Sequence, residues 1–477
     1  MRIDGYLSDV EFYSDANDPT VTYAEVEVPA IGASSIPYKL FVEVNDQKLK
    51  SFIRQFVLPG IEEKVTPAEL IQDAVDVLAL GGNPDSVAPR VRTAGKLMDG
   101  LIEYDLNTPS REYVRVTAKD WKITRKVKHK FLKRNTLGTQ VLPVRPQRDL
   151  LSLLRPYVNM DADGLILFAA WLVQGFCMGN HACALITAAA GSGKTAITKM
   201  ARRILDPSNL NATMLSSKKD DLHAALANSY FVAFDNTELS QESREISDIL
   251  CVAITGGTIA KRKLYTTNEV GVYELHSVVV INGVEISPAY SDLASRCLLF
   301  NLKPIDEQSR MTDEDLEKAF AQDLPEILGA IFTTLSDAMT VIKTLAPKRL
   351  PRMASSYKEM MAIAIALGVS EADFERIFFT NLAALDKARA NIAIVEAVQE
   401  YMNSRFVTGR AVKSTVSDLY EKIKENYSGD KRDLPKSPSH FSKRLKQEMR
   451  TFQAVGISVL LDDTFADGTH LKLIKDK

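Results

Sequence analysis

The stretch Ala184-Leu-Ile-Thr-Ala-Ala-Ala-Gly-Ser-Gly-Lys-Thr195 decides the fold of the central part of this chain. It takes a short apolar strand into a loop of small residues and then into a helix, predicted over Thr195–Leu205. Gly191 and Gly193 permit backbone angles and a close approach that a Cβ atom forbids. The N–H groups of such a loop and of the helix N-terminus point at anionic oxygens. The order strand, glycine loop, helix therefore predicts an α/β core that binds phosphate.

The residues of this loop predict ATP with Mg²⁺ as the ligand. Lys194 is placed to reach the β- and γ-phosphates, and the hydroxyl of Thr195 suits Mg²⁺. Ala188 stands where the G-x-x-x-x-G-K-[ST] pattern has its first glycine, and a small residue still fits there. The alternative is a chance Gly-Ser-Gly-Lys-Thr in a surface turn. The predicted nucleotide-binding residues are Ala190, Gly191, Ser192, Gly193, Lys194, Thr195 and Ala196.

Two later apolar strands end in polar side chains that suit the same site. Ser229-Tyr-Phe-Val-Ala-Phe-Asp-Asn236 ends in Asp235, a candidate ligand for Mg²⁺, followed by Asn236. His276-Ser-Val-Val-Val-Ile-Asn-Gly283 ends in Asn282, whose amide could orient an attacking water. The alternative for each is a turn-forming residue at the end of a strand.

Arg296 precedes a further apolar strand in Asp292-Leu-Ala-Ser-Arg-Cys-Leu-Leu-Phe-Asn-Leu302. An arginine at this place could reach the γ-phosphate held by a neighbouring subunit and stabilise charge in the transition state. The alternative is a surface ion pair. The candidate catalytic residues are Lys194, Asp235, Asn236, Asn282 and Arg296.

The order of these motifs resembles superfamily 3 helicases of the AAA+ class, in particular the helicase portion of phage and mobile-element primase-helicases. Related stretches lie at residues 221–229, 256–266 and 350–354, and the resemblance covers residues 90–477. It implies that Lys194 binds ATP, that Asp235 serves the metal, that Asn282 is the sensor and that Arg296 is the arginine finger. Many of these helicases have a second acid where this chain has Asn236, so the general base is unassigned, with Glu238 as one candidate.

The resemblance also implies where DNA binds. Lys261-Arg-Lys-Leu-Tyr-Thr-Thr-Asn-Glu-Val-Gly-Val-Tyr-Glu-Leu275 is a predicted hairpin that in the family lines the channel of a ring. Basic side chains there would contact phosphates and a tyrosine would stack on a base. The tail resembles a winged helix, with Ser437–Arg450 as recognition helix and residues 456–475 as wing; the alternative for that helix is a solvated face. The predicted DNA-binding residues are Lys261, Arg262, Lys263, Tyr265, Lys443 and Arg444.

Length and charge divide the rest of the chain. A chain of 477 residues is expected to hold two to four domains. Residues 1–90 hold 7 Lys and Arg against 15 Asp and Glu, a net of −8, whereas residues 401–477 hold 15 against 10, a net of +5. We predict an acidic α+β region (1–90), a small β-rich unit (91–147), an α/β ATPase core (148–310), a helical region (311–405) and a winged-helix domain (406–477). The basic run of residues 122–134 is either a DNA track or a solvated strand and loop.

The sequence thus predicts an ATP-dependent DNA helicase or translocase that acts in the replication of a phage or mobile element. By the resemblance it is a homo-hexamer on single-stranded or forked DNA. Two alternatives stay open: an origin-binding initiator or loader that hydrolyses ATP without unwinding, and a non-catalytic, nucleotide-regulated DNA-binding module. The four cysteines have no metal-ligand spacing, no apolar run is long enough to cross a membrane, and we expect a cytoplasmic protein.

Overall fold

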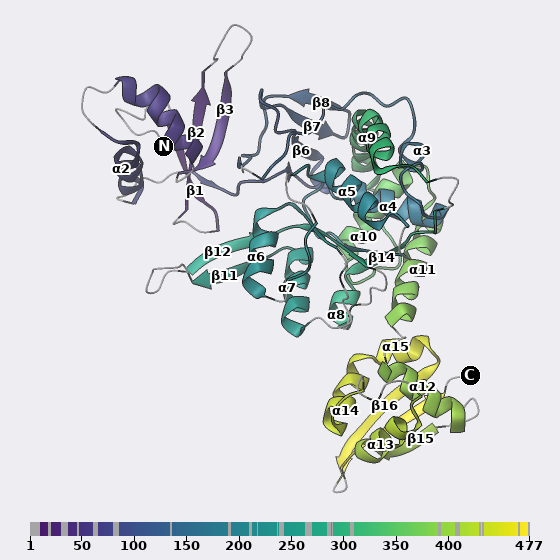
Figure 1. Ribbon diagram of the computed structural model, residues 1–477. Coiled ribbons are helices and arrows are strands. Elements are labelled where there is room, and N and C mark those ends of the chain that lie inside the picture. Colours follow the sequence, from purple (N-terminus) through teal and green to yellow (C-terminus); the bar gives the residue numbers. More distant parts are fainter. Residues whose placement is uncertain are drawn as a thin grey trace.

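The structure of the protein is a computed structural model. It describes residues 10–17, 21–29, 37–44, 47–60, 65–79, 85–133, 136–188, 192–208, 212–216, 218–235, 237, 243–262, 270–283, 288, 290–305, 310–389, 393–405, 411–428, 431, 434–465 and 468–475. These form a mixed α/β protein with several sheets. Figure 1 shows three parts: an N-terminal sheet with two helices, a large central part, and a C-terminal part below it.

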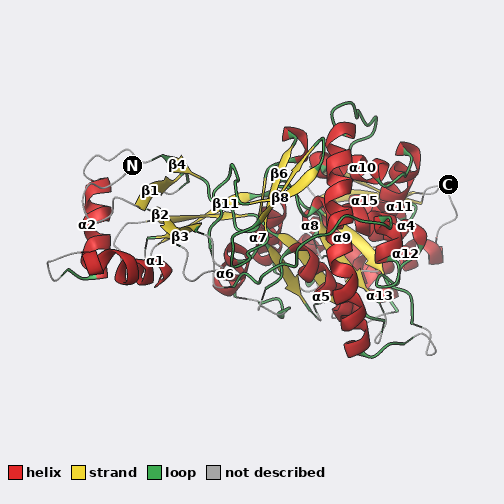
Figure 2. Ribbon diagram, turned by 90° about the horizontal axis from the view of Figure 1, so that it is seen from above, coloured by secondary structure: helices red, strands yellow, loops and turns green. Residues whose placement is uncertain are grey.

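The N-terminal part is a four-stranded sheet in the order β3-β2-β1-β4. Its alternating strands place apolar side chains on one face, where they pack with the helices that follow. Figure 2 shows this sheet and its helices at one end of the molecule, away from α9 and α10. The elements are β1 (Val10–Asp15), β2 (Thr22–Val28), β3 (Tyr38–Glu43), α1 (Gln47–Phe52), α2 (Pro67–Ala79) and β4 (Ser86–Val87).

The second sheet, in the order β5-β6-β7-β8, packs on the central helices. The indole N–H of Trp121 donates to the hydroxyl of Thr333 at 3.0 Å. Gly329 lies so close to the chain that a Cβ atom there would be 1.7 Å from the carbonyl oxygen of Val144. Residues 91–147, predicted as a separate unit, therefore share the core of the central part. The strands are β5 (Thr93–Ala94), β6 (Leu101–Asp105), β7 (Tyr113–Thr117) and β8 (Trp121–Thr124).

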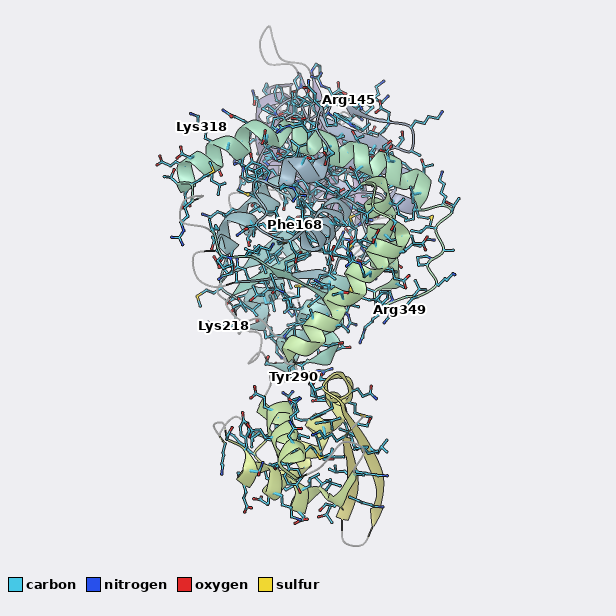
Figure 3. All side chains as sticks on the ribbon, turned by 90° about the vertical axis from the view of Figure 1, so that its right-hand side faces the viewer. Arg145, Phe168, Lys218, Tyr290, Lys318 and Arg349 are labelled. Atoms are coloured by element: carbon cyan, nitrogen blue, oxygen red, sulfur yellow. The ribbon has the colours of Figure 1, made fainter. Side chains whose placement is uncertain are left out.

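The central part is built around a parallel sheet in the order β10-β13-β9-β14. Its strands are mostly apolar and almost wholly buried, as expected for a parallel sheet covered on both faces. Figure 3 shows Phe168 inside this part, and its ring lies 5.4 Å from that of Phe300 in β14. The strands are β9 (Cys183–Thr187), β10 (Phe231–Phe234), β13 (Val278–Gly283) and β14 (Cys297–Asn301).

The helices of the central part surround this sheet, and an antiparallel hairpin, β11 (Gly257–Arg262) with β12 (Val270–Leu275), extends from it. Asp161, Ser243 and Thr312 cap three of these helices by accepting a backbone N–H of the first turn. The helices are α3 (Leu150–Leu154), α4 (Ala162–Gln174), α5 (Lys194–Leu205), α6 (Lys219–Asn228), α7 (Arg244–Thr255), α8 (Ser291–Ala294), α9 (Asp313–Val341), α10 (Ala354–Ala366) and α11 (Glu371–Arg389).

The C-terminal part has its own core. Its three strands pair in the order β15-β17-β16 and the antiparallel hairpin predicted near residues 456–475 is present. Helix α12 lies within the predicted helical region 311–405, but it packs in this C-terminal core because Ile394, Val395 and Met402 face it. The elements are α12 (Ala393–Arg405), β15 (Ala411–Thr415), α13 (Val416–Asn426), α14 (Pro438–Gln447), α15 (Met449–Ala454), β16 (Ile457–Phe465) and β17 (Gly468–Lys475).

Three further features of the described residues bear on function. All four cysteines are free and buried. Among the helices of the described residues, none is both long and apolar enough to cross a membrane. Within that same part of the chain there is no group of three or more His, Cys, Asp or Glu that could hold a metal ion.

The basic run near residues 122–134 is fixed by a buried carboxylate. Glu103 is 0% exposed and accepts the backbone N–H groups of Lys128 and His129 at 2.9 and 3.0 Å. Burial alone would raise the pKa of Glu103, but the hydrogen bonds from His129, Lys128 and Arg115 bring it to about 2. Because this pKa lies below that of an unfolded glutamate, the stabilisation is present above about pH 4.5 and is lost as the pH falls toward 2.

We therefore expect Glu103→Gln to loosen this run. Charge-assisted hydrogen bonds contribute about 1.5–3 kcal/mol each, so hydrogen exchange at the amides of Lys128 and His129 should accelerate by roughly tenfold to a hundredfold at pH 7. Mass-spectrometric exchange of the full chain measures this. Glu112→Gln, on the turn before β7, is the matched control and should leave both amides protected. Unchanged exchange in Glu103→Gln would contradict the role of this carboxylate.

Candidate functional site

The predicted phosphate loop follows β9 and leads into α5. Gly193 is the residue before α5, and its φ of 85° is in the left-handed region that glycine tolerates best. Lys194 begins the helix, and its ammonium donates to the carbonyl oxygen of Ala188 at 2.6 Å, back across the loop. Ser192 is buried, and Ala196 is half-buried on the first turn of α5. Ala190 and Gly191 lie outside the described residues.

Asp235, the candidate metal ligand, lies beside the start of α5. It follows β10, and its backbone N–H donates to the carbonyl oxygen of Thr213 at 2.9 Å. The hydroxyl of Thr195 donates to the Oδ2 atom of Asp235 at 3.4 Å. A hydroxyl and a carboxylate are hard oxygen donors of the kind that Mg²⁺ prefers, so this pair fits that ion. Asn236 and Glu238 lie outside the described residues.

Asn282 connects the sheet to the helix that carries Lys194. Its side chain is 0% exposed, and its Nδ2 atom donates to the hydroxyl of Thr198 at 3.1 Å. That hydroxyl in turn donates to the carbonyl oxygen of Lys194 at 2.9 Å. The first turn of α5 is therefore held against the carboxyl end of β13. The backbone carbonyl of Asn282 also accepts the N–H of Thr237, which lies two residues beyond Asp235.

The strand register explains why these residues meet. Asn282 pairs with Ile186 of β9, and Phe234 of β10 pairs with Ile281. Since β9, β10 and β13 run parallel, their carboxyl ends share one edge of the sheet. Four residues come together at that edge although they are up to 88 residues apart in sequence: Lys194, Thr195, Asp235 and Asn282. The structure therefore brings these four predicted site residues to one edge of the sheet.

Arg296 lies at the opposite edge of the same sheet. It precedes β14, and its carbonyl oxygen accepts the N–H of Cys183 at the start of β9. The loop of Lys194 follows the other end of β9, so five residues of strand, roughly 17 Å, separate the two positions. In Figure 1, α8 next to Arg296 and α5 lie on different sides of the sheet. Arg296 is thus not part of the cluster formed by the other four residues.

Asp292 holds Arg296 in place. One guanidinium nitrogen of Arg296 lies 3.1 Å from the Oδ1 atom of Asp292 and donates to its carbonyl oxygen at 2.7 Å. Arg352 pairs with the same carboxylate at 2.6 Å. Burial would raise the pKa of Asp292, but the hydrogen bond and charge of Arg296 and the charge of Arg352 lower it below its usual value. The carboxylate therefore remains charged and orients both arginines.

Sequence reasoning missed Thr198 and Asp292 as parts of these two sites. Each was signalled by helical spacing, since Thr198 is four residues after Lys194 and Asp292 is four residues before Arg296. Neither spacing says which strand the side chain meets, so the contacts of Asn282 could not be inferred from it.

The predicted DNA-binding residues fall in two places. Lys261 and Arg262 belong to β11, where they pair with Gly271 and Val270 of β12, and their side chains are outside the described part. Lys263 and Tyr265 lie outside the described residues. Lys443 is exposed and Arg444 half-buried on α14, whose Phe441 and Leu445 are buried. The predicted helix 437–450 is interrupted at Glu448, after which α15 begins.

Comparison with known proteins gives one family match. The model of a family described as actinomycete integrative conjugative element replication protein matches residues 149–382. The match takes in the parallel sheet, the residues at both of its edges and α9, and it ends within α11. It supports a function related to replication in a mobile genetic element. Among curated proteins, none matches this chain.

The solved structures that match this chain include two of the NrS-1 C-terminal region, both described as apo structures. One, an A form, has a TM-score of 0.43 at 12% identity and covers 98% of this chain and 97% of its own. The other has a TM-score of 0.40 at 12% identity and covers 98% of this chain and 96% of its own.

Proposed function

We propose that this chain is an ATP-hydrolysing motor that moves along or unwinds DNA during replication of a mobile element, with an AAA+ core of the superfamily 3 helicase type. The observation that carries the proposal is the meeting of Lys194, Thr195, Asp235 and Asn282 at the carboxyl edge of a parallel sheet. Ligands of α/β proteins bind at this edge. The match to a replication protein family supports the setting in DNA replication.

In this proposal each side chain has one task toward ATP and Mg²⁺. The ammonium of Lys194 attracts the β- and γ-phosphates, and the N–H groups at the start of α5 donate to phosphate oxygens. Thr195 and Asp235 hold the metal ion, which when bound withdraws charge from the phosphates. The amide nitrogen of Asn282 donates to the hydroxyl of Thr198, so the main role of Asn282 in this proposal is to position α5.

The site requires a second copy of the chain to be complete. Arg296 is at the opposite edge of the sheet from its own phosphate loop, so it would act on the ATP of a neighbouring subunit. A closed ring gives every subunit one such neighbour. We therefore propose a homo-hexamer around single-stranded DNA, with the β11–β12 hairpin facing the DNA. The hairpin residues proposed to contact the DNA are Lys261, Arg262, Lys263 and Tyr265.

The C-terminal part is proposed as a winged helix. Helices α12, α13 and α14 pack on the sheet of β15, β16 and β17, and the last two strands form the hairpin that the wing needs. Lys443 and Arg444 on α14 would contact DNA phosphates.

Two assays distinguish the alternative functions. ATP turnover that is stimulated by single-stranded DNA would exclude a non-catalytic binding module. An unwinding assay on a forked duplex separates a helicase from a loader.

Lys194→Ala is the first test of the proposal. Removing the ammonium should lower ATP turnover by roughly a hundredfold or more and weaken ATP binding, because the negative charge of the phosphates is then no longer balanced by Lys194. Phosphate release with and without single-stranded DNA measures this. Lys199→Ala, an exposed lysine on the same helix, is the control and should keep full activity. Normal turnover by Lys194→Ala would remove the loop from the mechanism.

Arg296→Ala tests whether the arginine acts on a neighbour. The variant should bind ATP normally and lose about a thousandfold in turnover, as expected for an arginine finger. Adding an excess of Lys194→Ala subunits should restore part of the activity, because a mixed interface then joins an intact loop to an intact Arg296. If mixed oligomers form and no ratio of the two variants recovers turnover, action between subunits is ruled out.

A further inference from the structure

Asp292 pairs with two arginines through a single oxygen atom. Nη1 of Arg296 lies 3.1 Å from Oδ1 of Asp292, and Nη1 of Arg352 lies 2.6 Å from the same Oδ1. Each guanidinium has one positive charge and several N–H donors. One carboxylate therefore balances only one of the two charges, and a net positive charge remains where the two arginines meet.

The two arginines come from elements that are far apart in sequence. Arg296 lies between α8 and β14, whereas Arg352 lies in the connection between α9 and α10, just before α10 begins. The fold nevertheless places both guanidiniums on one anionic oxygen. A phosphate group carries oxygens of similar charge and size, so one phosphate beside Asp292 can reach both arginines.

Arg352 is the more exposed member of the pair. Its side chain is 47% exposed, against 14% for that of Arg296. Within the described part of the chain, Asp292 is the one residue that accepts from either guanidinium. Arg352 thus presents exposed donors for which the described residues offer no acceptor. A guanidinium with donors to spare suits phosphate, which it can bind through two parallel hydrogen bonds.

We propose that Arg352 is a second arginine that contacts the phosphates of the ATP held by a neighbouring subunit, beside Arg296. This inference rests on the proposed function, from which it takes the neighbour's ATP. Arg352 stabilises negative charge on the phosphates and transfers no proton. Asp292 keeps the two guanidiniums side by side, so both reach the same phosphate group when the ring closes.

Arg352→Ala tests the contact by ATP turnover. The variant keeps its own phosphate loop and the pair of Arg296 with Asp292, so it should bind ATP with unchanged affinity. Its turnover should fall by roughly tenfold to a hundredfold, because one donor to the charge of the transition state is lost. Calorimetry with ATP and Mg²⁺ measures binding, and phosphate release measures turnover.

Lys348→Ala is the matched control. Lys348 is also an exposed cation in the connection between α9 and α10, but it does not pair with Asp292. Its removal should change turnover by less than about twofold. An equal loss in this control would mean that any cation of the connection has the same effect, which contradicts a specific role of Arg352.

A second readout separates contact with phosphate from positioning of Arg296. Sedimentation with a slowly hydrolysed ATP analogue gives the protein concentration at which half of the chains are assembled. Arg352→Ala should need roughly tenfold more protein than wild type, since charge-assisted hydrogen bonds across the interface are lost. Adding Arg352→Ala to Arg296→Ala should raise the concentration by a further fivefold or so. A double variant that assembles like Arg296→Ala alone would show that Arg352 only positions Arg296, which overturns the inference.

The remaining outcomes also decide between the alternatives. If Arg352→Ala keeps normal turnover and assembly but binds single-stranded DNA more weakly without ATP, the phosphate belongs to DNA and the inference is wrong. Loss of turnover in Arg296→Ala without loss in Arg352→Ala refutes this inference alone. A wild-type chain that neither binds nor hydrolyses ATP refutes the proposed function, and this inference with it.

Discussion

The hydrogen bond from Asn282 to Thr198 is the contact on which the central geometry depends. It is buried, it joins the carboxyl end of β13 to the first turn of α5, and through Thr198 it reaches the carbonyl oxygen of Lys194. A buried amide without its partner is costly, so the contact strongly favours one position of the helix. The places of Lys194 and of Thr195 beside Asp235 follow from that position.

The parallel sheet imposes a second constraint. Every strand of β10, β13, β9 and β14 runs the same way, so residues that follow a strand and residues that precede one lie at opposite edges. Arg296 precedes β14 and is oriented by Asp292, which it shares with Arg352. A single subunit thus has the predicted phosphate loop at one edge of the sheet and Arg296 at the opposite edge, so the two do not meet within that subunit. The proposed ring rests on this arrangement.

The sequence was informative where the signal is local. A glycine loop between a strand and a helix, and strands that end in Asp235 and Asn282, lie within short stretches, and parallel strands bring their ends together. Contacts between distant segments had no such signal. Arg92 is wholly buried and pairs with Asp206 at 2.8 Å, which ties the second sheet to the central part. The support of the basic run by Glu103 and the packing of α12 with the C-terminal strands are likewise long-range contacts that no periodicity reveals.

The most direct measurement is calorimetric titration of the full chain with ATP, with Mg²⁺ and with Mg²⁺ withheld. If the edge near Lys194 is a triphosphate site in which Thr195 and Asp235 hold the metal ion, binding saturates at one ATP per chain and weakens when Mg²⁺ is withheld. If ATP gives no binding under either condition, with single-stranded DNA present or absent, the cluster at this edge of the sheet is not a nucleotide site.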